Sequence, residues 1–175
     1  MNAPVVSLDG SNRKIIRVTP TMDAGTAYAD GDVLFNSTEI PNAVAHNGGC
    51  SRLVGAFLNN HKDSSFNFDL IFTENQVNLG TRNDAVGSGS LWTEALAKAS
   101  GVIGFLETEA GDNDVNLINS QIVKLHADTA HAIGFFPMLL QAASDSTSIY
   151  FAGIDRTGSI DFGADDLEFI IHIEY

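Results

Sequence analysis

The chain has 175 residues, of which 44% are hydrophobic and 18% charged. This composition predicts a globular fold, because a disordered chain would be poorer in apolar residues and a compact chain of this length hides roughly 70% of its unfolded surface. The formal net charge of −13 repels phosphate backbones and anionic lipid, so it argues against nucleic acid and membranes as partners.

Cys50 is the only cysteine, which excludes an intrachain disulfide. The first residues show no basic leader followed by a long apolar run, and no later segment reaches the roughly 18 apolar residues of a membrane span. We therefore expect a protein that is made and folded in a cytoplasm.

Nine segments have the composition or the alternation of β-strands, and they are separated by turns rich in Gly, Asp, Asn and Ser. In chain order these segments are 14–19, 32–36, 50–59, 66–72, 102–108, 118–125, 133–140, 148–155 and 167–175. The clearest alternation lies in "FNFDLIF" and in the C-terminal "LEFIIHIEY", where every second residue is apolar. Such strands bury one face and expose the other.

Only "SLWTEALAKAS", residues 90–100, has helical spacing, with Ser90 as its N-cap. One short helix cannot build an α/β fold. The sequence therefore predicts an all-β fold, an antiparallel two-sheet β-sandwich of jelly-roll type with one short helix. An immunoglobulin-type sandwich is disfavoured, because it is normally shorter and carries a Cys, Trp, Cys pattern. We assign residues 1–12 to an N-terminal arm and residues 13–175 to the sandwich.

His46 and Cys50 raise the possibility of a reactive pair, since a cysteine nucleophile needs a nearby base. Gly48 and Gly49 lie between them and disfavour a helix, and on an extended strand the two would be more than about 10 Å apart. We interpret the segment as a turn that leads into a strand, with Cys50 acting as a small hydrophobic residue.

"HADTAH" contains His126, Asp128 and His131, which are residue types that ligate zinc or iron. The odd spacing of the two histidines places them on opposite faces of a strand, so we favour an ordinary loop. Two acidic segments have the oxygen-rich composition of calcium loops, but neither matches the twelve-residue calcium-binding pattern, and solvated turns are the better interpretation. Their acidic residues are Glu107, Glu109, Asp112 and Asp114 in the first, and Asp161, Asp165, Asp166 and Glu168 in the second.

Motifs of hydrolases, nucleotide-binding loops and zinc proteases are missing from the sequence. We therefore predict no catalytic, metal or cofactor site, and not an enzyme.

One run carries more information than any motif of chemistry. It extends from Arg17 to Asn75 and contains "TPT", a Tyr-x-x-Gly-Asp-hydrophobic step at Tyr28 to Val33, an Asn-Ala pair, a Gly-Gly turn and "DLIF". This run resembles a family of small virion proteins of tailed phages, common in phages of cyanobacteria and other aquatic bacteria.

The resemblance implies a capsid decoration, or cement, protein that folds as a jelly roll and sits on the outer surface of the capsid. It further implies the major capsid protein as partner and a homotrimer as the assembly. A cement protein stabilises a shell by binding the assembled lattice better than free subunits, through many repeated contacts.

Four apolar residues precede the first predicted strand and lack an obvious inward role: Pro4, Val5, Val6 and Leu8. We expect this arm to order against a neighbouring subunit or the shell. The alternative is that it forms a first edge strand of the same domain.

Two other functions remain open from the sequence. A jelly roll can bind carbohydrate in a fibre or tail protein, for which Trp92, Tyr28 and Tyr150 are the candidate aromatic residues. A metal enzyme of cupin type would depend on His126, His131 and His172.

Deleting residues 2–12 should leave the domain folded and weaken its binding to the shell, because the arm supplies contact area rather than core. Circular dichroism and co-sedimentation with capsids measure the two effects separately. Loss of folding without a specific binding defect would contradict the arm hypothesis.

Overall fold

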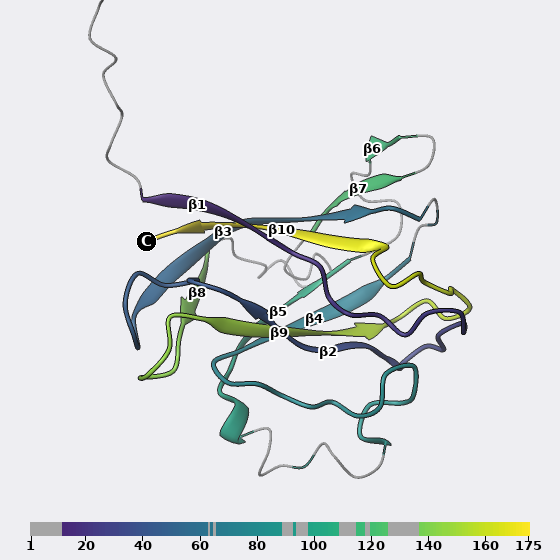
Figure 1. Ribbon diagram of the computed structural model, residues 1–175, viewed down its shortest axis with the longest axis horizontal. Helices are drawn as coiled ribbons and strands as arrows, with labels where there is room; N and C mark the ends of the chain where they lie inside the picture. The colour runs from purple at the N-terminus through teal and green to yellow at the C-terminus, as the bar shows by residue number, and fades with distance from the viewer. Residues whose placement is uncertain are drawn as a thin grey trace, which may run out of the picture.

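The computed structural model contains two antiparallel β-sheets that pack face to face (Figure 1). It describes residues 12–62, 64, 66–88, 93, 98–108, 115–117, 120–125 and 137–175. The four arm residues Pro4, Val5, Val6 and Leu8 lie outside these ranges. The predicted all-β sandwich is confirmed.

The first sheet, uppermost in Figure 1, has six strands. Its order is β1 (Arg13–Val18), β10 (Leu167–Glu174), β3 (Cys50–Asn60), β7 (Gln121–Lys124) and β6 (Val115–Asn116), and β8 (Met138–Gln141) also pairs with β3. The second sheet has four strands. Its order is β2 (Val33–Ile40), β9 (Ile149–Asp155), β4 (Phe68–Thr73) and β5 (Val102–Glu107).

The chain crosses between the sheets at six of the nine connections between the described strands. β1, β3, β6 to β8 and β10 belong to the first sheet, whereas β2, β4, β5 and β9 belong to the second. Strands from the two ends of the chain are neighbours in both sheets, since β1 pairs with β10 and β2 pairs with β9. This wrapped antiparallel order is that of a jelly roll.

β7 and β8 share one edge of β3. The half of β3 from Phe57 to Asn60 pairs with β7, and the half from Cys50 to Leu53 pairs with β8. Within the described residues, the strands predicted at 118–125 and 133–140 are represented by β7 and β8, which occupy one strand position between them. The segment 126–136, which contains the predicted His126, Asp128 and His131, connects them and lies outside the described residues.

Phenylalanine rings join the sheets at the centre of the core. Phe35 on β2, Phe151 on β9 and Phe169 on β10 are completely buried. The ring centroids are 5.2 Å apart for Phe35 and Phe151, 5.5 Å for Phe35 and Phe169, and 5.1 Å for Phe151 and Phe169. Tilted and edge-to-face contacts of this kind add to the free energy gained from burial alone. The three rings therefore fix the separation and alignment of the sheets.

The strongly alternating segments behave as predicted. All inward residues of β10 are buried and all outward residues are half-buried, and Phe68, Leu70 and Phe72 of β4 are buried. The helix predicted at 90–100 is confirmed only in its last turn, residues 98–100, and Thr93 lies outside any helix. The other residues of that segment are not among those described.

A segment after β4 covers part of the outer surface of the second sheet. Val77 and Leu79 are buried against Val33, Ala152 and Ile154 in a second, smaller apolar cluster. The Asn36 side chain anchors this segment, because its Oδ1 accepts a hydrogen bond from the Leu79 N–H and its Nδ2 donates to the Gly80 carbonyl. In Figure 1 this segment runs below β9 and β2, on the side away from the first sheet.

Gly153 on β9 leaves room for the Phe35 ring, because glycine has no side chain. A Cβ at Gly153 would lie 2.5 Å from Cε1 of Phe35 and 2.9 Å from its Cζ, distances that real contacts do not reach. Gly55 on β3 is a suitable comparison, because a Cβ there would meet its nearest neighbour, a ring carbon of Phe57, at an ordinary 3.7 Å.

The variant Gly153→Ala should lower the free energy of unfolding by about 1–3 kcal/mol, because the Phe35 ring must shift within a full core. Gly55→Ala should remain within about 1 kcal/mol of the wild type. Urea unfolding followed by circular dichroism measures both values. Equal effects of the two substitutions would contradict this account of the core.

Candidate functional site

The His46 to Cys50 segment forms a turn, as predicted. The Gly49 N–H donates to the His46 carbonyl at 2.9 Å, and the Gly48 N–H donates to the Ala143 carbonyl at 3.1 Å. Gly48 has a φ of +66°, in the left-handed region that favours glycine. A Cβ at Gly49 would lie 3.2 Å from the His46 ring, so the ring packs over this glycine.

Cys50 begins β3 on its outward face and is exposed. The prediction that it acts as a small packed hydrophobic residue is therefore wrong, because the register of β3 turns Ser51 and Leu53 inward instead. The turn has a structural role: it reverses the chain between two sheets.

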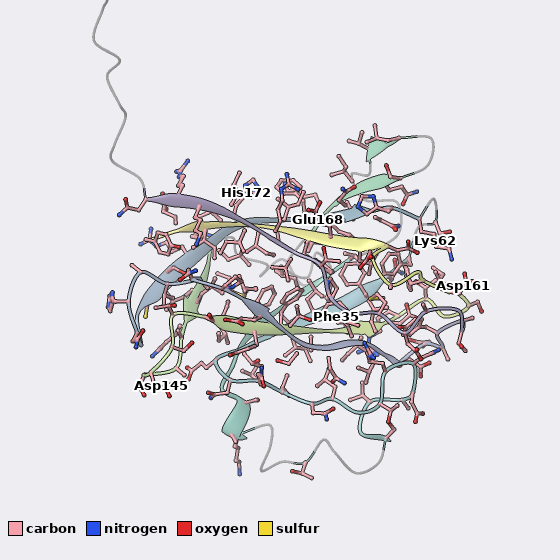
Figure 2. The ribbon with its side chains drawn as sticks, in the orientation of Figure 1. Phe35, Lys62, Asp145, Asp161, Glu168 and His172 are labelled. Atoms are coloured by element: carbon pink, nitrogen blue, oxygen red, sulfur yellow. The ribbon has the colours of Figure 1, made fainter. Side chains whose placement is uncertain are left out.

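The acidic residues near the C-terminus have separate partners. Asp161 pairs with Lys62, and the hydrogen bond and charge of that lysine lower the pKa of Asp161 below its usual value. Figure 2 shows this pair at one end of the sandwich. Glu168 lies on the outer side of β10, where it accepts hydrogen bonds from Arg17 at 3.0 Å and Asn59 at 3.3 Å.

Asp166 accepts a hydrogen bond from the Gly163 N–H, which makes it part of a tight turn. Within the described ranges, no group of three or more His, Cys, Asp or Glu side chains is arranged to hold a metal ion. Glu107 lies on β5, whereas Glu109, Asp112 and Asp114 are outside those ranges. Among the helical residues that the structure describes, none forms a helix long and apolar enough to cross a membrane.

Tyr28 is 1% exposed, so it cannot stack on a sugar, and this candidate was wrong. Its hydroxyl accepts a hydrogen bond from the Asp23 N–H at 2.8 Å and donates to the Leu34 carbonyl at 3.2 Å. Burial raises the pKa of this phenol.

A turn follows Tyr28 in the chain. Gly31 has a φ of +88°, and Asp32 accepts a hydrogen bond from the Ala29 N–H at 2.7 Å. The Tyr-x-x-Gly-Asp segment is therefore a structural turn that directs the chain into β2.

The other aromatic and histidine candidates have different environments. Trp92 lies outside the described residues, and Tyr150 on β9 is half-buried. His172 lies on the outer side of β10, away from Phe35 in the core, as Figure 2 shows. Its ring centroid is 5.2 Å from that of Phe57 on the neighbouring strand β3. The described candidates do not converge on one cleft.

Asp155, at the end of β9, is a buried carboxylate that sequence reasoning missed. Its Oδ2 accepts from the Gly158 N–H at 2.7 Å, and burial raises its pKa above the usual 3.8 despite this hydrogen bond. The sequence signal was present in Asp155-Arg156-Thr157-Gly158, where an aspartate precedes glycine by three residues in a turn.

The second sheet carries an apolar hollow beside its edge strand β5. Val102 and Phe105 are 55% and 52% exposed, which is unusual for large apolar side chains on a strand. Phe105 lies directly opposite Ile71 on β4. We call this hollow of about 340 Å³ the β5 groove. Its lining residues are Asp69, Ile71, Val102, Phe105, Glu107, Ile154 and Arg156.

Charged residues border the β5 groove. Arg156 Nε lies 2.6 Å from Asp69 Oδ2, and Glu107 is directly opposite Asp69 in the strand register. An apolar centre with a charged rim is the arrangement found in protein-binding surfaces. The groove was not foreseen, because the sequence does not show which strand lies at a sheet edge.

Comparisons of the chain with protein-family models, with curated proteins and with solved structures found no match.

Acidification from pH 7 toward about 4 should stabilise the wild type relative to Asp155→Asn, because protonation removes a buried charge. A carboxyl group whose pKa rises on folding adds stability below its unfolded pKa and loses it as the pH rises through the folded pKa. Urea unfolding at several pH values measures this difference.

Asp161→Asn is the matched control for that experiment. The pKa of Asp161 is lowered on folding, so its contribution is present above the unfolded pKa and is lost as the pH falls. From pH 7 to about 4 the difference for Asp155→Asn should therefore change while that for Asp161→Asn stays nearly flat. The slope for Asp161→Asn, of opposite sign, should appear only below the unfolded pKa of 3.8. A pH-independent difference between the wild type and Asp155→Asn would contradict the assignment.

Proposed function

We propose that this chain is a structural virion protein, a capsid decoration protein that binds the outer surface of the major capsid protein shell. The sequence resemblance between Arg17 and Asn75 suggests this role, and the β5 groove is the structural observation that supports it most directly. The groove offers exposed apolar side chains on a rigid sheet, which a partner can cover without a conformational change.

The architecture suits such a role physically. A double-layered sandwich joined by buried phenylalanine rings is stiff, so a contact made on one face costs little conformational entropy. Each site of a shell repeats many times, and modest contacts summed over the lattice resist expansion of the particle. The acidic net charge also keeps free copies soluble before they bind.

The Val102 and Phe105 side chains are the groove residues with most apolar area to lose to a partner. Replacement of either by Asp should place an unpaired charge in the contact and weaken binding to shells of the major capsid protein at least about tenfold. Co-sedimentation of the full chain with shells that lack it measures this change.

Gln76→Asp is the control, because Gln76 is exposed, lies outside the β5 groove and gains the same charge. It should bind shells as the wild type does. Equal binding by all three variants would show that the β5 groove is not part of the contact with the shell. Cryo-electron microscopy of particles with no density for this chain would contradict the proposed function itself.

A further inference from the structure

The outer surface of the first sheet, which we call the β10 face, is built from outward residues of all six strands. The strand register places Arg13, Glu174, Arg52 and Leu139 in one row across it. A second row contains Ile15, His172 and Gly55, and a third contains Arg17, Ile170, Phe57 and Lys124. The last row contains Glu168, Asn59, Ile122 and Val115.

The β10 face is basic although the chain is acidic. Among the residues that the structure describes, it carries four Lys and Arg residues but only two acidic residues, Glu168 and Glu174. Both of these are paired with arginines of β1, at 3.0 Å to Arg17 and 3.1 Å to Arg13. Arg52 and Lys124 are exposed and leave the face with a formal charge of +2, against −13 for the whole chain.

The same face exposes apolar side chains. Ile15 and Leu139 are each 60% exposed, and Val115 is 55% exposed. Ile15 lies on the edge strand β1, and Leu139 and Val115 lie on the short strands β8 and β6. Few side chains of neighbouring strands are therefore available to cover them. Apolar side chains mixed with arginine are enriched in protein interfaces.

The two sheets differ in how their outer surfaces are covered. The segment containing Val77 and Leu79 packs on the second sheet, whereas the described loops leave the β1 and β10 side of the first sheet open (Figure 1). With strands about 4.8 Å apart and about 3.3 Å per residue, the β10 face measures about 600 Å² before side-chain relief. That is close to the roughly 800 Å² that each partner buries in a standard interface.

An acidic surface lies at one end of the same sandwich, formed by the loops 19–32 and 156–166. The two loops are joined by backbone hydrogen bonds from Tyr28 N to the Ile160 carbonyl and from Ser159 N to the Tyr28 carbonyl. We call this surface the acidic end, and its carboxylates at least partly exposed to solvent are those of Asp23, Asp30, Asp161, Asp165 and Asp166. Three cations lie at this end: Lys62 pairs with Asp161, Arg156 pairs with Asp69 of β4, and Arg82 donates to the Thr21 carbonyl. The five carboxylates still outnumber them.

We propose that the β10 face of one copy binds the acidic end of a second copy. The charges are complementary, and the partner surface is present on every molecule of the chain. Because the two surfaces are different parts of one molecule, the contact is heterologous and closes into a ring when the rotation between copies permits. We expect three copies in that ring, and this number alone rests on the proposed decoration role.

The full-length chain should self-associate in dilute salt, and raising NaCl from about 50 mM to about 500 mM should weaken this association at least about tenfold, because salt screens the charges. Light scattering coupled to size-exclusion chromatography, together with analytical ultracentrifugation, measures the mass. Ile15→Asp and Asp165→Lys should each shift the wild-type oligomer toward the monomer, and circular dichroism verifies that both variants fold.

Val102→Asp is the matched control, since Val102 is also β-branched, lies on an edge strand and is 55% exposed, but belongs to the second sheet. It should associate as the wild type does. A monomer at all concentrations and salt conditions, or dissociation caused by Val102→Asp rather than Ile15→Asp, would overturn the proposal. Dissociation by Ile15→Asp with no effect of Asp165→Lys would overturn the heterologous contact, since two β10 faces would then meet.

Self-association and shell binding can fail separately. A monomer that still binds shells contradicts only this inference, because the β5 groove lies on the other sheet. A salt-sensitive oligomer that binds no shell contradicts only the proposed function.

Discussion

The contact between the aromatic rings of the two sheets is the constraint on which the rest of the structure depends. Phe35, Phe151 and Phe169 fill the space between the sheets and leave little freedom in sheet separation. Gly153 allows Phe35 to approach the backbone of β9 closely. Since the core accepts few other arrangements, both outer surfaces are rigid platforms. A protein whose work is adhesion benefits from this rigidity, because its contacting side chains are already in place before a partner arrives.

The two platforms are chemically different. The second sheet keeps part of its outer surface under its own chain and leaves the β5 groove open at its edge. The first sheet remains uncovered on the β1 and β10 side and collects arginines that most of the surface lacks. An acidic protein gains from this separation, because its copies repel one another except where the basic face meets an acidic surface. Two surfaces on opposite sheets can serve two partners, one of them another copy.

Local sequence patterns predicted those features that depend on neighbouring residues. Alternation in β4 and β10 identified their buried faces, and Gly48 and Gly49 identified the turn before β3. Tyr28 was misjudged, because its burial depends on Phe162 and Ile160, which are distant in sequence and lie beside it only in the folded chain. Cys50 was misjudged for a related reason, since a one-residue change in register reverses the face on which a strand residue lies.

The sequence by itself determined the all-β class, the two-sheet sandwich and the acidic character of the chain, because periodicity and composition are local properties. Only the tertiary structure decided which strands are edges, and hence that Val102 and Phe105 remain exposed. It also decided that arginines from β1 and β3 share one face with Lys124. The physical reason is that pairing between strands distant in sequence brings their side chains together, and no single segment encodes its neighbours.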